Sequence, residues 1–200
     1  MRDLTPPAGG LFLVGLLFRP SLDLDRFENE LTSHVQALAH SKMILCSEGW
    51  HPAQGLPKIA MRSPEVPFHY TNYYRPEMGD DLLRLFLIYE GVWSQDLLVP
   101  AKQMAREMET MFLDTGGNRT VNVDPGILTL ERLVLATSKN FLHRIYLADG
   151  IFADLTLIYK KGGFVPLEWT FPDYQDVWTL DFLNSARKGL KVLLKQANMI

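Results

Sequence analysis

The sequence lacks the features on which several classes of protein depend. It contains one cysteine, Cys46, which excludes a disulfide framework and a cysteine pair for a zinc site. No apolar run approaches the about 18 residues that a membrane span needs. The chain has 20 basic and 23 acidic residues, a net charge of −3, so it lacks a basic coat for nucleic acid. We therefore expect neither a membrane protein nor a protein whose main partner is a nucleic acid.

Common catalytic and cofactor motifs are also missing. The phosphate loop G-x-x-x-x-G-K-[ST] does not occur, and Gly9, Gly10 and Gly15 have the wrong spacing for a dinucleotide-binding fingerprint. The zinc-protease motif H-E-x-x-H and the hydrolase motif G-x-S-x-G are absent as well. The five histidines fall in separate predicted elements without the spacing of metal ligands. The sequence therefore indicates no reaction type and no cofactor, and we expect no metal site.

The composition that remains is that of an ordinary globular domain, with 47% apolar and 22% charged residues. A chain of 200 residues can bury roughly 70% of its unfolded surface, enough for a well-packed core. No repeat or low-complexity tract divides the chain. We expect one α+β domain over residues 1–200: a mostly antiparallel sheet with about three packed amphipathic helices, and residues 1–10 as a flexible arm.

The apolar run Leu11–Phe18 allows two interpretations, a strand or the core of a signal peptide. Gly15 interrupts the run, no small-residue cleavage site follows it, and Arg19-Pro20 ends it where a strand would end. We interpret the run as a strand and expect a cytoplasmic protein. A lone cysteine fits a reducing compartment.

Three segments show the three- and four-residue spacing of amphipathic helices. The first extends from Leu24 to Leu38, the second from Leu98 to Phe112, and the third begins soon after Asp173. These helices are expected to pack on the sheet.

Strands and loops are predicted between these helices from residue alternation and from glycine and proline. Residues 49–67 are rich in proline and glycine and are expected to form a loop. Residues 124–126 are expected to turn the chain into a short helix. The segment 82–92 also fits a buried helix by pattern, and we favour a strand. The strands are expected at 43–46, 68–74, 82–92 and 119–123, with a turn at 76–81 and hairpin loops at 149–150 and 161–163.

Polar residues concentrate between Arg119 and Asp173, inside segments that are otherwise apolar. On an extended strand Asn122 and Asp124 share one face, and the neighbouring valines occupy the other. We therefore expect these two polar side chains to leave the strand together.

The hairpin predicted at Asp149-Gly150 suggests a catalytic pair. A two-residue loop there would place Ile145 opposite Asp154 and make His143 a diagonal neighbour of Asp154, roughly 7 Å away, with Arg144 on the other face. A carboxylate that orients a histidine serves general-base catalysis, so His143 and Asp154 are the catalytic candidates. The same contact is also a common structural hydrogen bond, and both interpretations stay open.

Basic and aromatic side chains near this face could hold a ligand. Arg119, Lys139 and Arg144 suit the recognition of phosphate or carboxylate groups. Tyr73 and Tyr74 could form a stacking or hydrogen-bonding wall. Each of these residues also fits an ordinary role in surface charge or packing.

The chain resembles a bacterial family that is catalogued only as a domain of unknown function. This resemblance covers nearly the whole chain and is most specific from Tyr73 to Tyr174. It implies a compact bacterial protein without an established activity, and some family members are labelled GTP-binding proteins. The segments that carry it are Tyr73-Tyr74, Glu77-Met78-Gly79, Val121 to Gly126, Leu128-Thr129, Leu133 to Thr137, Lys139, His143 to Leu147, Gly150, Thr156-Leu157, Trp169-Thr170 and Pro172-Asp173-Tyr174.

The leading hypothesis is a small-molecule binding protein, enzyme or not, for an anionic or phosphorylated ligand such as a nucleotide. Besides the catalytic candidates, its ligand-binding candidates are Tyr73, Tyr74, Arg119, Asn122, Asp124, Lys139 and Arg144. The alternative is a non-catalytic module that meets protein or RNA through a basic stripe on the last helix (Arg187, Lys191 and Lys195) or through the rim at Tyr73 and Tyr74. A third hypothesis makes all these groups internal hydrogen-bond partners. The oligomeric state stays open.

Overall fold

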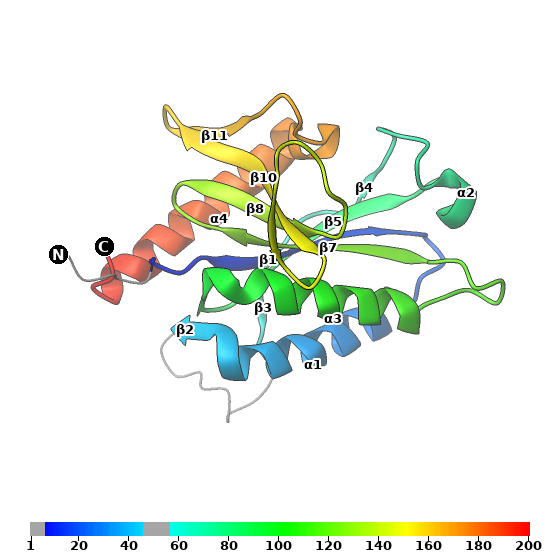
Figure 1. Ribbon diagram of the computed structural model, residues 1–200, viewed down its shortest axis with the longest axis horizontal. Helices are drawn as coiled ribbons and strands as arrows, with labels where there is room; N and C mark the ends of the chain where they lie inside the picture. Colours follow the sequence, from blue (N-terminus) through cyan, green and yellow to red (C-terminus); the bar gives the residue numbers. More distant parts are fainter. Residues whose placement is uncertain (1–6, 46–56) are drawn as a thin grey trace.

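The computed structural model describes residues 7–45 and 57–200, which form an antiparallel sheet with helices on both faces (Figure 1). This confirms the predicted α+β class. Within the described ranges nine strands join one sheet in the order β11-β10-β8-β7-β1-β5-β3, with β4 beside β5 and β9 beside β10, and β2 pairs with β6 separately. The strands are β1 (Leu11–Phe18), β2 (Met43–Leu45), β3 (Ile59–Arg62), β4 (Val66–Pro67), β5 (Leu83–Tyr89), β6 (Val92–Trp93), β7 (Val121–Leu128), β8 (Arg132–Thr137), β9 (Arg144–Ala148), β10 (Ile151–Lys160) and β11 (Gly163–Pro166). The helices are α1 (Leu24–Lys42), α2 (Arg75–Met78), α3 (Leu98–Met111) and α4 (Val177–Gln196), with short 3-10 helices η2 (Gln95–Leu97) and η3 (Pro172–Tyr174).

Strand β1 lies at the centre of the sheet, between β5 and β7. Its even-numbered side chains, Phe12 among them, pack with α1 and α3. On the other face Leu11 and Leu13 pack towards α4, and Leu17 packs with Met78 of α2. All eight of its residues are buried. The apolar run 11–18 is therefore continuous because both faces of this strand are covered, which confirms its interpretation as a strand.

The three long helices begin and end close to their predicted positions. Asp23 caps α1 by accepting a hydrogen bond from the backbone N–H of Arg26 at 3.1 Å. Buried side chains recur along each helix at helical spacing, as the sequence pattern predicts. Among the described residues, no helix is long and apolar enough to cross a membrane.

The predicted turn and short helix after residue 123 are wrong. Strand β7 continues through Pro125 and Gly126, and the residues expected in the helix form β8. Proline is tolerated because β8 pairs with β7 only from Gly126 onward, so the missing N–H of Pro125 removes no hydrogen bond of the sheet. The first half of β7 is thereby separated from β8, and the sheet is split at this point.

Helix α3 completes the hydrogen bonding of β7 along this split. The carboxylate of Glu109 accepts the backbone N–H of Val123 at 2.8 Å, and the ammonium of Lys102 donates to the carbonyl of Val123 at 2.9 Å. Both side chains are buried. They replace the strand partner that β7 lacks, because a buried backbone group must find a hydrogen-bond partner.

Two other segments differ from their predicted structure. Residues 68–74 do not form a strand, and the chain turns there before α2, which replaces part of the turn predicted at 76–81. The loop predicted at 49–67 holds β3 and β4, which pair with β5 despite the flanking prolines. Residues 49–56 of that loop, together with Cys46, lie outside the described residues.

Candidate functional site

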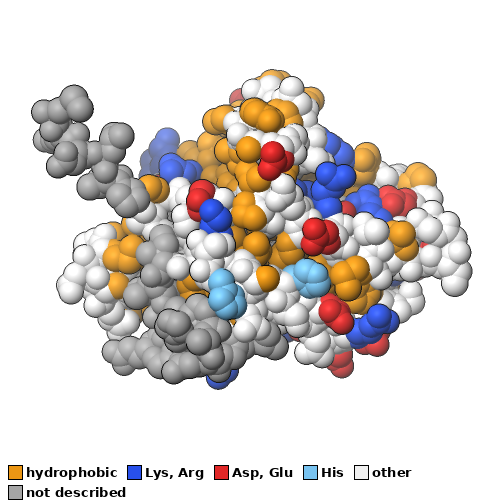
Figure 2. Space-filling view, turned by 60° about the horizontal axis from the view of Figure 1, so that its bottom comes forward, with side chains coloured by type: hydrophobic (Ala, Val, Ile, Leu, Met, Phe, Trp, Pro, Cys, Tyr) orange, Lys and Arg blue, Asp and Glu red, His pale blue; other side chains and the backbone are white. Residues whose placement is uncertain are grey.

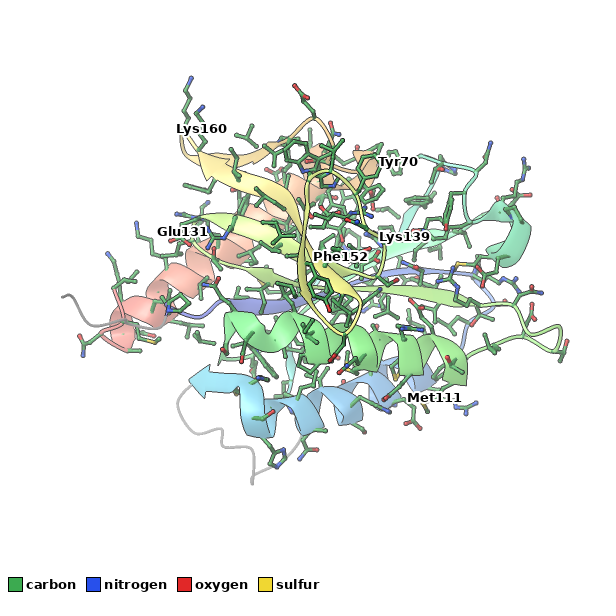
Figure 3. The ribbon with its side chains drawn as sticks, in the orientation of Figure 1. Tyr70, Met111, Glu131, Lys139, Phe152 and Lys160 are labelled. Atoms are coloured by element: carbon green, nitrogen blue, oxygen red, sulfur yellow. The ribbon has the colours of Figure 1, made fainter. Side chains whose placement is uncertain are left out.

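The split between β7 and β8 opens into a cleft of about 480 Å³. Its walls come from β5, β7, β8, β9, β10, α3, η3 and the segment before α2. Tyr70 and Lys139 both lie at its mouth (Figure 3). Of the nine residues proposed from the sequence, eight line this one cavity: Tyr73, Tyr74, Arg119, Asn122, Asp124, Lys139, Arg144 and Asp154. His143 is not among the lining residues.

The floor of the cleft is a buried ion cluster around Arg84. Its NH1 donates to Asp124 at 3.2 Å, and its Nε lies 2.9 Å from the carboxylate of Asp173, without the alignment of a hydrogen bond. The guanidinium also lies over the Tyr174 ring, 5.1 Å from the centroid. Gly15 of β1 makes room for this cluster, since a Cβ there would stand 2.9 Å from the hydroxyl of Tyr174.

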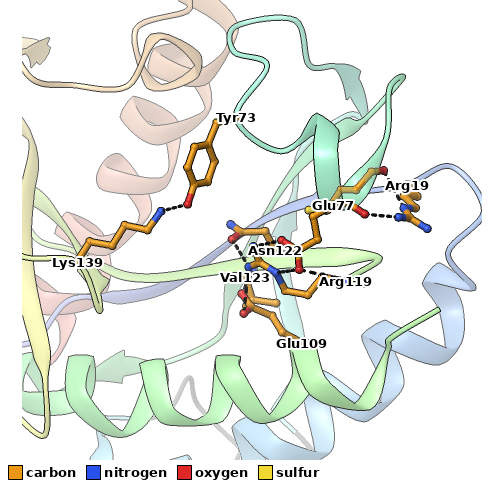
Figure 4. Close-up of polar contacts among 9 residues, drawn as sticks. Arg19, Tyr73, Glu77, Glu109, Arg119, Asn122, Val123 and Lys139 are labelled. Atoms are coloured by element: carbon orange, nitrogen blue, oxygen red, sulfur yellow. Dashed lines mark hydrogen bonds and ion pairs between the residues drawn. The ribbon is translucent and has the colours of Figure 1, made fainter. Parts of the chain in front are cut away.

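Arg119 is held in place by neighbouring acidic and amide groups (Figure 4). It forms a bidentate ion pair with Glu77 of α2, at 2.8 and 2.7 Å, and its NH1 lies 3.4 Å from Glu109. The same NH1 donates to Oδ1 of Asn122 at 3.2 Å. Arg119 is therefore neutralised and acts mainly as a brace for the residues around it.

Besides Nε of Arg84, which faces Asp173 in the ion cluster, two buried polar atoms in the cavity lining have no hydrogen-bond partner among the described residues. They are Nδ2 of Asn122 and the hydroxyl of Tyr174. Asn122 is 7% exposed and Tyr174 is 1% exposed. An unpaired buried donor is costly by about 1–3 kcal/mol, so such groups in a cavity wall favour a polar ligand or ordered water.

At the mouth of the cleft, Lys139 contacts Tyr73. The ammonium of Lys139 donates to the Tyr73 hydroxyl at 2.5 Å and lies 4.1 Å from the ring centroid. Figure 4 shows this pair on one side of the cleft and the Arg119 cluster on the other. Arg106 of α3 also lines the cleft and is exposed. In the described part of the chain, neither Lys139 nor Arg106 has a carboxylate partner.

The expected hairpin between β9 and β10 forms, but its register differs from the prediction. Asp149 and Gly150 have positive φ angles of 53° and 74°, as a tight loop requires. A bulge after the loop shifts the pairing by one residue, so Arg144, not Ile145, lies opposite Asp154. The expectation that Arg144 points to the other face is therefore wrong, and its Nε donates to Asp154 at 2.8 Å.

The proposed catalytic pair does not form an aligned hydrogen bond. Nε2 of His143 lies 3.4 Å from the carboxylate of Asp154, and neither ring nitrogen has a hydrogen-bond partner in the described structure. The imidazole stacks on the Trp169 ring at 4.9 Å with an interplanar angle of 9°. Asp154 instead accepts the hydrogen bond of Arg144, and His143 packs against Trp169 outside the cleft lining.

Burial and ion pairing shift the pKa values of the acidic side chains near the cleft in opposite directions. Burial raises the pKa of Glu109 against the opposing effects of Lys102 and the Val123 N–H. Burial likewise raises the pKa of Asp173, although Arg84 opposes it. The hydrogen bonds from Arg119 lower the pKa of Glu77. Burial thus destabilises the ionised forms of Glu109 and Asp173, whereas Arg119 stabilises the ionised form of the more exposed Glu77.

The sequence interpretation missed the contributions of β5, α3 and η3 to the cleft. Arg84 interrupts an apolar strand, which is a signal of a buried charge. Lys102, Arg106 and Glu109 recur at spacings of four and three, which places them on one face of a helix. Strand β5 and helix α3 line the same cavity because the sheet is split between β7 and β8. The turn predicted at 124–126 did not allow for this split. No group of three or more His, Cys, Asp or Glu residues in the described structure could hold a metal ion.

Comparison with known proteins gives a family but no activity. No curated protein and no solved structure shows significant similarity to the chain. The model of one family, described as "Domain of unknown function (DUF4416)", matches residues 50–189. This range contains the lining of the cleft except Leu17. Since the match covers more than half of the sequence, the chain belongs to the DUF4416 family, a domain of unknown function.

Proposed function

We propose that the protein binds a small anionic or phosphorylated organic molecule, of the nucleotide class, in the cleft between β7 and β8. One observation carries this proposal: the buried donors of Asn122 and Tyr174, unpaired within the described structure, share a cavity with Lys139 and Arg106, for which the same residues provide no carboxylate partner.

The basic residues of the cleft support an anionic ligand. Arg84, Arg119 and Arg144 are each paired with carboxylates of the protein. Lys139 and Arg106 are different, since both are exposed and lack such a partner among the described residues. An ammonium and a guanidinium at the entrance of a partly enclosed cavity attract phosphate or carboxylate groups.

The aromatic residues at the mouth support a ligand with a planar part. Tyr70, Tyr73 and Phe171 line the cleft, and Tyr73 remains 59% exposed. Tyr73 and Tyr74 pack edge to face, with their ring centroids 5.1 Å apart. An exposed aromatic ring beside a cation suits stacking on a base or another flat ring.

The alternative of a protein- or RNA-binding module has less support. Of its basic stripe on α4, Arg187 is engaged within the protein, because its Nε donates to the carbonyl of Leu130 at 2.7 Å. Its guanidinium also lies 3.3 Å from the Tyr159 ring centroid. The remaining lysines, Lys191 and Lys195, are both exposed on α4.

A thermal-shift experiment tests the proposal with GTP, ATP and pyrophosphate, and with guanosine and adenosine as uncharged counterparts. We expect a nucleotide to raise the melting temperature and its nucleoside to have a much smaller effect. A ligand at 100 times its dissociation constant stabilises the protein by about 2.7 kcal/mol, which such a measurement resolves.

Matched variants assign the effect to the cleft. The double variant Arg106→Gln, Lys139→Gln should lose the shift, and Lys191→Gln on α4 removes one exposed charge outside the cleft and should keep it. The proposal is overturned if no phosphorylated compound stabilises the protein, or if the double variant responds as the wild type does.

A further inference from the structure

The segment from Phe141 to Leu147 carries an apolar surface that the protein itself leaves uncovered. Ile145 is 69% exposed, Leu142 84% and Tyr146 59%, and Phe141 and Leu147 are exposed as well. The space-filling view shows hydrophobic side chains on the projecting part of the molecule, with lysine and arginine side chains gathered beside it (Figure 2). Single exposed apolar residues are ordinary, but five within seven positions mark an interaction surface.

The same segment contains a sheet edge without a partner. Among the described strands, β9 pairs only with β10, so the backbone groups along its other side have no strand to bind. Proteins usually protect such an edge with charged residues or proline. The only charge on β9 is Arg144, and Asp154 neutralises it. The edge is therefore open to pairing with another strand.

We propose that this edge joins two copies of the chain into a dimer, through antiparallel pairing of β9 with β9 of a second copy. The backbone N–H of Arg144 already donates to the carbonyl of Phe141 at 3.0 Å. Strand pairing would bind the outward backbone groups of the rest of β9 and would bring its apolar side chains against those of the second copy. A lipid surface could cover the side chains, but it offers no hydrogen-bond partner for the backbone in its apolar part. The observations therefore favour a protein strand over a membrane, and this inference does not depend on the ligand of the cleft.

A twofold axis at Tyr146 gives a self-consistent register. Arg144 then lies opposite Ala148 of the other copy, and Ile145 lies opposite Leu147. The two Arg144 side chains are placed at opposite ends of the pair, so like charges do not meet. Tyr146 faces its own copy across the axis, and aromatic pairs of this kind stabilise neighbouring strands. A symmetric pairing of one surface with itself is the commonest arrangement in dimers.

The exposed apolar area provides more than half of the area that a standard dimer interface buries on each partner. From the exposed fractions, the five apolar side chains offer on the order of 500 Å² per copy. A standard interface buries about 800 Å² on each partner. The backbone of the edge and the remaining atoms of residues 141–148 would add to the apolar contribution.

Measurement of the molar mass by light scattering tests the proposal. At micromolar concentration, the full chain should have twice the mass of one copy. Ile145→Lys should reduce it to a single copy, because the lysine would lie in the interface. The control Val177→Lys changes a residue on α4 that is 76% exposed and should leave the dimer intact. A wild-type protein of single-chain mass, or an Ile145→Lys variant that remains a dimer, would overturn the proposal.

Disulfide trapping tests the register independently. Directly opposed residues of an antiparallel pair have Cα atoms about 4.5–5.5 Å apart, within the range of a disulfide. In a chain with Cys46→Ser, Tyr146→Cys should form a covalent dimer on mild oxidation, and Val177→Cys should not. Equal cross-linking at both positions would indicate random collision and contradict the pairing. A different result would assign the surface to a membrane instead. In that case the wild-type protein would remain a single copy and sediment with anionic lipid vesicles, and Ile145→Lys would abolish the sedimentation.

Discussion

Arg119, two residues before β7, and Glu77 of α2 form a bidentate ion pair that joins the short helix to the start of this strand. Helix α2 has four residues and no side-chain cap, so it does not hold its position alone. Arg19 assists by donating to the carbonyls of Glu77 and Met78. Because Tyr73 and Tyr74 immediately precede this helix, the two arginines also fix the aromatic side of the cleft.

Removal of the ion pair should loosen α2 and lower stability. We expect Glu77→Gln to reduce the free energy of unfolding by about 1 kcal/mol, since the pair is partly exposed and solvent weakens it. Urea denaturation measures the change, and Glu107→Gln, at an exposed position of α3, is the matched control. A loss of equal size in both variants would show that the pair contributes nothing specific.

The close approach at Gly15 gives a second prediction. A methyl group there would contact the hydroxyl of Tyr174, and NH2 of Arg84 would lie 3.3 Å from it. We expect Gly15→Ala to destabilise the protein by about 1–3 kcal/mol, as overpacking of a core does. Tyr174→Phe removes a hydroxyl that lacks a partner among the described residues, so alone it should leave the stability unchanged or raise it.

The double variant decides whether the hydroxyl is the cause. Gly15→Ala combined with Tyr174→Phe should recover much of the stability lost in Gly15→Ala, which a double-mutant cycle by thermal unfolding would show. If the two effects simply add, the strain lies elsewhere in the cluster, for example at Phe86.

Much of the fold follows from residue periodicity. The run 11–18 and the three long helices could be predicted because their burial patterns are periodic or continuous over many residues. The continuation of β7 through Pro125-Gly126 could not, since that dipeptide is typical of a turn. Pro125 fits in the strand only because β8 does not pair with it. That arrangement depends on the tertiary structure and not on the local sequence.

Part of the candidate site could be predicted from the sequence for the same reason. Polar residues inside apolar strands, such as Asn122 and Asp154, indicate the region in which the structure has its cleft. The register of the hairpin could not be predicted from the sequence. One bulge residue shifts the pairing, so that Arg144 takes the place of Ile145 opposite Asp154. The role of α3 was also hidden, since Lys102 and Glu109 look like surface residues until the open edge of β7 is seen.

The pairing of Lys102 with the edge of β7 gives a third prediction. Lys102→Met should preserve the packing of the side-chain stem but leave the carbonyl of Val123 without its donor. We expect a loss of about 1–3 kcal/mol in the free energy of unfolding, the usual effect of an unpaired buried acceptor. Gln103→Met, at an exposed position of the same helix, should change it by less than about 0.5 kcal/mol. Similar values for the two variants in urea denaturation would contradict the role assigned to Lys102.

The raised pKa of Glu109 predicts a pH dependence of stability. A carboxyl group whose pKa is higher in the folded state binds its proton more tightly there, so the folded protein loses stability as the pH rises above the usual value of 4.5. The variant Glu109→Gln cannot ionise and lacks this contribution, while Asp173 contributes similarly to both proteins. From about pH 5 to pH 8 the wild type should therefore become less stable relative to Glu109→Gln, by an amount that levels off above the pKa of the folded state.

This comparison avoids the lower pH range, where the ionisation of Glu77 intervenes. Arg119 contacts both acids, so loss of Glu109 would strengthen its effect on Glu77. The stabilisation by Glu77 is fully present above its ordinary pKa of 4.5 and is lost as the pH falls through its lowered pKa. Thermal unfolding of both proteins in the Glu77→Gln background removes this contribution. A stability difference that stays constant with pH, or that changes in favour of the wild type, would show that Glu109 is not destabilised by burial.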